Sequence, residues 1–174
     1  MPPEHAMEPQ RAPDRSSVHV VSLDDLEHPV VRTGAHYWRM LRGARKLPAR
    51  ADLAPREMRA ILKNIVLVRS IDGGKDYEYR ITGDAQVQAF GINFRDMRIS
   101  HITAASPDFG RMMHGLYEQV RSTTEPFAVR GWVGREVADA RFVYYESVFL
   151  PLGDDGETVD HILIVSNYVP KALD

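Results

Sequence analysis

The chain has 174 residues, of which 44% are hydrophobic and 9% aromatic, as expected for one globular domain of ordinary size. Its formal net charge of -2 excludes a general basic field for nucleic acid or an anionic membrane. The absence of cysteine excludes disulfides, thiolate nucleophiles and cysteine-ligated metals, and it fits a cytoplasmic protein.

The N-terminal part divides into an arm and an extension. Residues 1–17 are rich in proline and charge, which predicts a weakly ordered arm without the apolar stretch of a secretory signal. The apolar piece at 18–21 is an edge strand or an extended arm. We expect residues 18–63 to form an N-terminal helical extension and residues 64–170 to form the main domain.

Two helices are expected in the extension. Apolar residues near helical spacing predict the first over residues 33–45, after an interruption at Pro29. Asp52 is a capping residue, and it predicts a second helix that begins near Pro55.

A hairpin and short helices open the main domain. The β-branched run 65–71, the turn sequence 72–74 and the return strand 77–82 predict the hairpin. A short helix is expected over residues 85–90, and only short turns are expected over residues 92–106.

The last third predicts a long helix and three strands. Pro107 near the start of an amphipathic stretch predicts a helix up to about residue 121. Strands follow at 127–133, 141–152 and 158–168. This order predicts an α+β fold with a five-stranded antiparallel sheet and helices on one face.

Recurring motif residues give the chain a family likeness over residues 33–168. They are Tyr37, Trp38, Leu41, Arg42, Arg45, Pro48, Arg50, Asp52, Pro55, Tyr79, Arg80, Gly83, Phe90, Gly91, Glu146, Leu150, Pro151, Leu152, Asp155 and Gly156. In this pattern the chain resembles a bacterial family of stand-alone PAS-like domains. The resemblance implies the PAS strand order, with the first strand of the five central. It also implies a sensory or interaction domain with no assigned reaction, and it names no cofactor.

The resemblance and the apolar stripe on the 107–121 helix together predict a cavity for a small apolar or amphipathic ligand between that helix and the sheet. The candidate ligand-binding residues are Phe90, Phe109, Met112, Met113, Leu116, Trp132, Tyr144 and Glu146. We therefore expect a non-enzymatic regulatory domain that binds such a molecule, a signalling protein partner, or both.

Glu146 shares the apolar face of its strand by alternation. A buried carboxylate requires a cationic partner, and Arg80, on another strand, is the preferred candidate for a structural ion pair. Arg50 is the alternative, and a contact of Glu146 with a ligand stays open.

The histidines support an alternative. His114 lies one helical turn before Glu118, but a metal site requires three or four ligands, so we expect no metal at His114 or His101. The alternative function is a small cavity enzyme in which Glu146 and a histidine act as acid and base. A scaffold that binds no ligand is a third possibility.

The first helix is the expected homodimer interface. Tyr37, Trp38 and Leu41 are apolar residues of an amphipathic helix that needs a partner surface. The alternative is that Trp38 folds back onto the sheet of its own chain.

Overall fold

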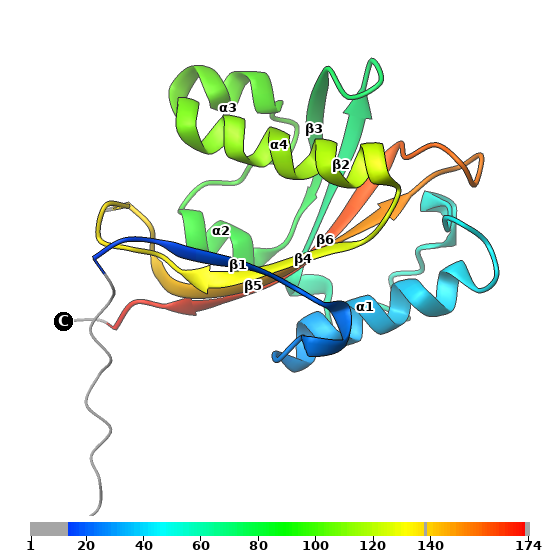
Figure 1. The fold of residues 1–174 in the computed structure, drawn as a ribbon, viewed down its shortest axis with the longest axis horizontal. Helices are drawn as coiled ribbons and strands as arrows, with labels where there is room; N and C mark the ends of the chain where they lie inside the picture. The colour runs from blue at the N-terminus through cyan, green and yellow to red at the C-terminus, as the bar shows by residue number, and fades with distance from the viewer. Residues whose placement is uncertain (1–13, 138, 173–174) are drawn as a thin grey trace, which may run out of the picture.

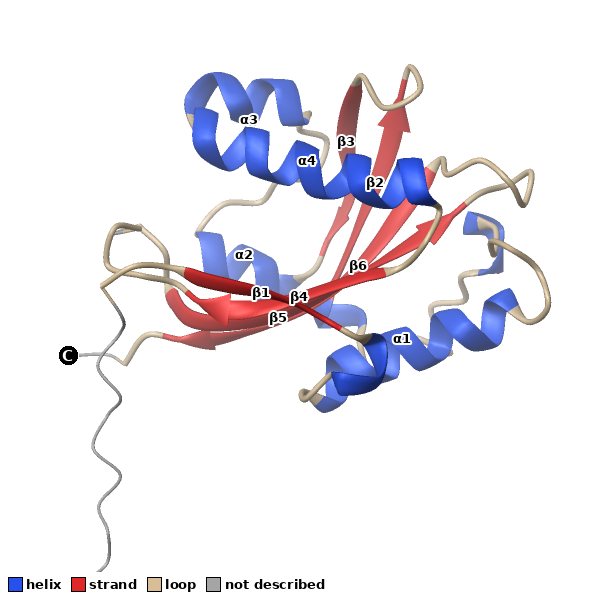
Figure 2. Ribbon diagram, in the orientation of Figure 1, coloured by secondary structure: helices blue, strands red, loops and turns tan. Residues whose placement is uncertain are grey.

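The computed structural model describes residues 14–137 and 139–172 and shows one antiparallel sheet between two helical layers (Figures 1 and 2). The strands, in the order in which they pair, are β1 (Ser17–Val21), β4 (Phe127–Trp132), β5 (Phe142–Leu152), β6 (His161–Pro170), β2 (Ile65–Ile71) and β3 (Asp76–Thr82). The predicted α+β fold is confirmed. The sheet has six strands and not five, because residues 17–21 form an edge strand on β4. Residues 1–13 of the predicted arm lie outside the described residues.

The first of the five predicted strands is interior but not central. Strand β2 pairs with β6 on one side and with β3 on the other, so one strand separates it from the edge. The hairpin between β2 and β3 turns through residues Asp72, Gly73 and Gly74, all at positive φ, as the turn sequence predicts.

The helices of the main domain lie on one face of the sheet, as predicted, and the helix of the N-terminal extension covers the other face. The helices are α1 (Pro29–Arg42), α2 (Asp84–Phe90), α3 (Ile99–Ala105) and α4 (Pro107–Thr123). Helix α1 lies on one face, and α2, α3 and α4 lie on the other (Figure 1). Three short 3-10 helices, at Leu23–Asp25, Arg50–Asp52 and Leu62–Asn64, lie in the connections.

Helix α1 begins four residues before the predicted start. Pro29 does not interrupt it but occupies its first turn, where a missing N–H costs nothing. The His28 side chain caps this turn by accepting a hydrogen bond from the Val30 N–H at 3.2 Å.

The helix predicted near Pro55 does not form. Asp52 accepts hydrogen bonds from the Ala49 N–H at 2.9 Å and from Arg45 at 2.8 Å, so it closes a short 3-10 turn instead of capping an α-helix. The chain then continues in turns as far as the 3-10 helix Leu62–Asn64.

Helix α3 forms in a segment where only turns were predicted. The carboxylate of Asp76, at the start of β3, accepts hydrogen bonds from the Ser100 N–H at 3.1 Å and from its hydroxyl at 2.6 Å. Helix α3 is therefore fixed by a strand that is distant in sequence. Its crossing with α4 is close enough that a Cβ at Gly110 would lie 2.5 Å from the Thr103 Cα.

The α1 face carries the first core layer. Its buried side chains include Val31, Trp38, Leu67, Val148, Leu150, Leu152, Leu163 and Val165. Helix α1 lies so close to β6 that a Cβ at Gly34 would meet the side chain of Val165 at 2.6 Å. Glycine at this position therefore sets the distance between helix and sheet.

Candidate functional site

The second core layer, between the sheet and α2, α3 and α4, is rich in aromatic rings. The rings that contact one another are Phe90, Phe94, Phe109, Tyr79, Tyr117, Phe142, Tyr145, Phe149 and Tyr168. Their centroids lie 4.8–6.4 Å apart across these contacts, which is the usual range for packed aromatic pairs. This layer is the candidate functional site.

Two pairs of hydroxyl groups lie buried in this layer. The hydroxyls of Tyr79 and Tyr117 are 2.9 Å apart, and those of Ser147 and Ser166 are 2.7 Å apart. Burial raises the pKa of both tyrosines, so these phenols stay neutral. In each pair either oxygen can donate, so both pairs can reorient toward a polar atom placed beside them.

Helix α4 is attached to the β2–β3 hairpin through polar side chains. Tyr77 donates a hydrogen bond to the Glu118 carboxylate, which also accepts two hydrogen bonds from Arg121, at 2.8 and 2.9 Å. The Arg121 guanidinium holds the pKa of Glu118 below its usual range. His114 contacts the carbonyl oxygen of Gly74 at 3.1 Å. The second half of α4 is therefore held in place, and its apolar side chains face the sheet.

A cleft of about 360 Å³ opens between the hairpin, α3 and α4. Its lining residues are Lys75, Asp76, Ile99, Ser100, Thr103, Arg111 and His114. The charged groups of this lining are the cations Lys75 and Arg111 and the carboxylate of Asp76, which is bonded to Ser100. Sequence reasoning missed the cleft because α3 was not predicted.

The sheet separates the predicted ligand-binding residues into two groups. Phe90, Phe109, Met113 and Leu116 pack against the aromatic layer, which agrees with their predicted location. Met112 points away, with 49% of its surface exposed.

The other three predicted residues lie on the α1 face. Trp132 pairs with Tyr144 across β4 and β5, with ring centroids 5.0 Å apart, and Glu146 is the next residue of β5 on that face. The eight candidate ligand-binding residues therefore do not share one face of the sheet, and ligand binding by any of them stays a prediction. Strand alternation divides them, and it could have been applied to Glu146 and Tyr144 together with Phe149.

Glu146 is buried, as predicted, with 2% of its surface exposed. Its carboxylate accepts hydrogen bonds from the N–H groups of Glu27, at 2.9 and 3.1 Å, and of His28, at 2.9 Å. The cation beside it is Arg130, at 3.5 Å, which faces it across β4 and β5. The predicted partners Arg80 and Arg50 were wrong. The register of β4 and β5 decides this pairing, and the long connection between them does not reveal it.

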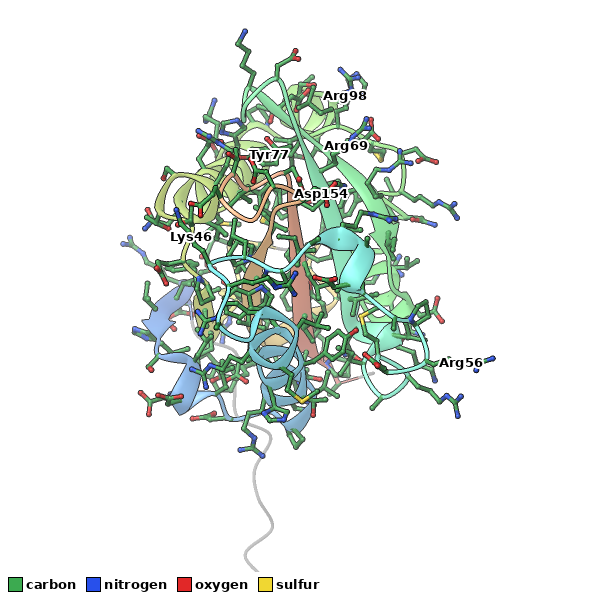
Figure 3. All side chains as sticks on the ribbon, turned by 90° about the vertical axis from the view of Figure 1, so that its right-hand side faces the viewer. Lys46, Arg56, Arg69, Tyr77, Arg98 and Asp154 are labelled. Carbon is green, nitrogen blue, oxygen red and sulfur yellow. The ribbon has the colours of Figure 1, made fainter. Side chains whose placement is uncertain are left out.

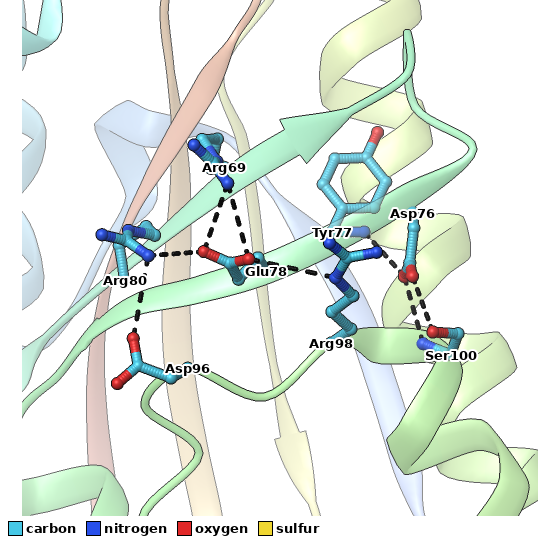
Figure 4. A network of polar contacts seen from close by, with 8 residues as sticks. All are labelled: Arg69, Asp76, Tyr77, Glu78, Arg80, Asp96, Arg98 and Ser100. Atoms are coloured by element: carbon cyan, nitrogen blue, oxygen red, sulfur yellow. Dashed lines mark hydrogen bonds and ion pairs between the residues drawn. The ribbon is translucent and has the colours of Figure 1, made fainter.

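Arg80 belongs to a different cluster, on the face of β2 and β3 opposite to Tyr77 and Tyr79 (Figure 4). It contacts Glu78 at 2.5 Å, and Arg69 and Arg98 contact the same carboxylate. These residues come from separate segments, so no spacing in the sequence indicates the cluster.

The residues predicted for a dimer interface are used inside the chain. The Trp38 indole donates a hydrogen bond to the carbonyl oxygen of Pro151 at 2.8 Å, and the Tyr37 hydroxyl accepts one from the Ala54 N–H at 3.0 Å. Leu41 packs against the same core layer. Trp38 therefore folds back onto its own sheet, which was the alternative.

The arrangement required for acid–base catalysis is not formed by the predicted residues. Glu146 lies on the α1 face, whereas His114 lies beside the hairpin on the α4 side, and His101 is exposed. Within residues 14–137 and 139–172, no three histidine or acidic side chains are grouped to hold a metal ion. None of the helices in this described part combines the length and apolar character needed to cross a bilayer.

The chain was compared with family models, curated proteins and solved structures. No curated protein and no solved structure matches the chain. A family model described as a PAS domain matches residues 26–165, from the segment before α1 into β6, and so includes α1 and both core layers. Because this match covers most of the sequence, the chain belongs to the PAS domain family.

Proposed function

We propose that the protein is a cytoplasmic regulatory module that takes a small apolar or amphipathic molecule between α4 and the sheet and transmits the change to a protein partner. Membership of the PAS domain family indicates the sensory or regulatory role. The ligand, its location, the partner and the compartment are parts of the proposal.

The observation that carries the proposal is the pairing of buried hydroxyls within an aromatic layer. Tyr79 and Tyr117 are fully buried, and their one mutual contact uses only one of two O–H donors. No further hydrogen bond of either hydroxyl forms within the described part of the chain. A ligand carbonyl or hydroxyl placed there would supply the missing acceptor.

The surroundings select an apolar ligand body. The layer around the tyrosine pair consists of phenyl rings, Met113 and Leu116, and a bare charge placed among them would lose its hydration without a counterion. Methionine and leucine on α4 can change rotamer, whereas the rings can tilt, so the layer can admit a guest by rearrangement.

Helix α4 is the element that such a guest would displace. Its second half is bonded to the hairpin through Glu118 and Arg121, and its first half crosses α3 at Gly110. A ligand against Met113 would therefore act on the joint between α4, α3 and the hairpin. This arrangement supports transmission of the ligand-induced movement toward the β2–β3 edge of the sheet and away from α1.

A thermal-shift screen with matched variants tests the proposal. The probes are decanoate, indole, haem and flavin mononucleotide, with nucleotides and polar metabolites beside them. We expect at least one apolar or amphipathic probe to raise the melting temperature of the wild type by mass action. Met113→Trp fills the ligand space and should abolish the shift, whereas Met112→Trp, one residue away on the exposed side, should keep it.

If every stabilising compound is instead a polar metabolite that is consumed on incubation, the enzyme alternative replaces the binding module. Trp132 cannot serve as the reporter for this test, because it lies on the α1 face. Homodimerisation stays a prediction, and its interface would need a surface other than Tyr37 and Trp38.

A further inference from the structure

Three arginines converge on one carboxylate at the outer face of the β2–β3 hairpin. The Arg80 Nη1 lies 2.5 Å from Glu78 Oε1, the Arg69 Nη2 lies 3.4 Å from the same oxygen, and the Arg98 Nε lies 3.9 Å from Oε2 (Figure 4). We call Arg69, Arg80 and Arg98 the arginine surface. Because the hydrogen bond from Arg80 and the nearby guanidiniums lower the pKa of Glu78, this carboxylate stays ionised.

The charges in this cluster do not balance. Three guanidiniums face one glutamate. Among the described residues, Asp96 lies 3.7 Å from Arg80 and beside Arg95, and the carboxylate of Asp76 interacts electrostatically with Arg98. With Arg95 as a fourth cation and with Asp96 and Asp76 as two further anions, the described cluster keeps an excess of one positive charge. The chain as a whole has a net charge of -2, so this excess is local.

The guanidiniums are available to solvent. The side chains of Arg69, Arg80 and Arg98 are 47%, 43% and 46% exposed, whereas that of Glu78 is 12% exposed beneath them. Each guanidinium offers several N–H donors in a planar fork, and a single carboxylate accepts only part of them. Glu78 therefore uses only part of the donors that the three guanidiniums offer. Arg69 and Arg98 lie near one another at the hairpin (Figure 3).

The arginine surface is built by three segments. Arg69 comes from β2 and Arg80 from β3. Arg98 comes from a segment that pairs with β3, where the Tyr79 N–H donates to the Met97 carbonyl at 3.0 Å. The positions are thus fixed by backbone hydrogen bonds. A fixed, unbalanced row of guanidiniums matches carboxylates, which bind arginine forks with two parallel hydrogen bonds.

We propose that the arginine surface docks an acidic segment, rich in aspartate and glutamate, of a protein partner. Charge complementarity favours this occupant, because the row is short and is interrupted by Glu78 and Asp96. Nucleic acid and an anionic bilayer present long, continuous negative charge, which a short and interrupted row of three guanidiniums does not match.

The surface adjoins the joint that the proposed ligand would move. Asp76, two residues before Glu78, holds the start of α3, and Arg98 immediately precedes that helix. A shift of α3 would therefore move one of the three guanidiniums relative to the other two. The inference that the acidic partner receives the signal rests on the proposed regulatory function. The inference that it binds the arginine surface does not.

Fluorescence anisotropy with a fluorescein-labelled hexaglutamate peptide tests the surface on the full chain. We expect saturable binding at low salt that weakens as ionic strength rises. The double variant Arg69→Gln/Arg98→Gln should weaken it by about tenfold, since two charge-assisted contacts are removed. The matched control is Arg39→Gln/Arg135→Gln, which removes two exposed, ion-paired arginines elsewhere and should leave the affinity unchanged.

A second variant gives a result that a structural ion pair alone would not produce. Glu78→Gln removes the carboxylate that all three guanidiniums share, and it should therefore tighten hexaglutamate binding by several fold. Far-UV circular dichroism establishes that each variant is folded. If Glu78→Gln does not fold, the arginine double variant and its control still decide the outcome.

Three results would overturn the proposal: no binding of hexaglutamate at low salt, equal weakening in the arginine variant and its control, or unchanged affinity in the arginine variant. Vesicles containing phosphatidylserine, or a single-stranded oligothymidylate, bound through Arg69 and Arg98 in place of the peptide would assign the surface to a membrane or to nucleic acid. If the wild type does not bind the peptide but shows the ligand-induced thermal shift, the docking surface alone is rejected. If the wild type binds the peptide but shows no thermal shift, the ligand site alone is rejected.

Discussion

The two faces of the sheet are held by different kinds of interaction. On the α1 face, buried polar groups bond to fixed backbone atoms: Trp38 to the carbonyl of Pro151, and Glu146 to the N–H groups of Glu27 and His28. On the α4 face, the hydroxyl of Tyr79 bonds to that of Tyr117, and the hydroxyl of Ser147 bonds to that of Ser166, amid aromatic rings. The fixed backbone partners favour a rigid α1 face, whereas the hydroxyl pairs support our proposal that the α4 face repacks around a ligand.

The largest expected effect is at Glu146. Replacing Glu146 by alanine leaves two N–H groups and Arg130 without their buried acceptor, so we expect the free energy of unfolding to fall by about 3 kcal/mol. Urea denaturation measures it. Glu157→Ala, which removes an exposed ion pair to Lys46, is the control and should change stability by less than about 0.5 kcal/mol. An unchanged midpoint for Glu146→Ala would show that the α1 face is not held as described.

Trp38 should give the next largest effect. Trp38→Phe loses the indole hydrogen bond to Pro151 and part of a side chain that is 1% exposed, so we expect a loss of about 2 kcal/mol. Sedimentation of the same variant separates packing from association. A change in oligomeric state without a change in stability would return Trp38 to a dimer interface.

The tyrosine pair is expected to contribute less. Tyr79→Phe or Tyr117→Phe alone leaves one buried hydroxyl without its partner and should cost about 1 kcal/mol. The double variant should cost less than the sum, because no unpaired hydroxyl remains. Strict additivity in this double-mutant cycle would mean that the two hydroxyls do not interact.

The smallest effect concerns acid. The pKa of Glu118 is lowered in the folded chain, chiefly by Arg121, so its contribution is present above the ordinary glutamate pKa of about 4.3 and is lost as the pH falls below it. Thermal melts between pH 6 and pH 3 should therefore show less acid destabilisation in Arg121→Met than in the wild type. Identical pH profiles would show that the joint between α4 and the hairpin does not depend on this ion pair.

The elements that sequence reasoning predicted are those with local signals. The turn at Asp72–Gly74 and the apolar stripe of α4 are local, and they predicted the hairpin and the long helix correctly. Helix α3 depends on Asp76 of β3, and the pairing of Glu146 depends on the register between β4 and β5. Neither is written in a contiguous segment, so each required the fold.

The candidate site shows the same division. Phe109 and Met113 were found because helical periodicity reports which side of α4 faces the sheet. The arginine surface was missed because Arg69, Glu78 and Arg98 meet only after β2, β3 and the 96–98 segment have paired. Trp132 was assigned to the wrong face because the faces of different strands can be matched only when their register is known.

Native mass spectrometry tests most directly the claim that the α4 face accepts a small molecule. Wild-type, Met113→Trp and Met112→Trp proteins are measured after purification and after incubation with decanoate, indole, haem and flavin mononucleotide. We predict that the 19.7 kDa chain carries one bound molecule in the wild type and in Met112→Trp and none in Met113→Trp. A bare chain in all three proteins under every condition, or the same adduct in all three, would contradict the account.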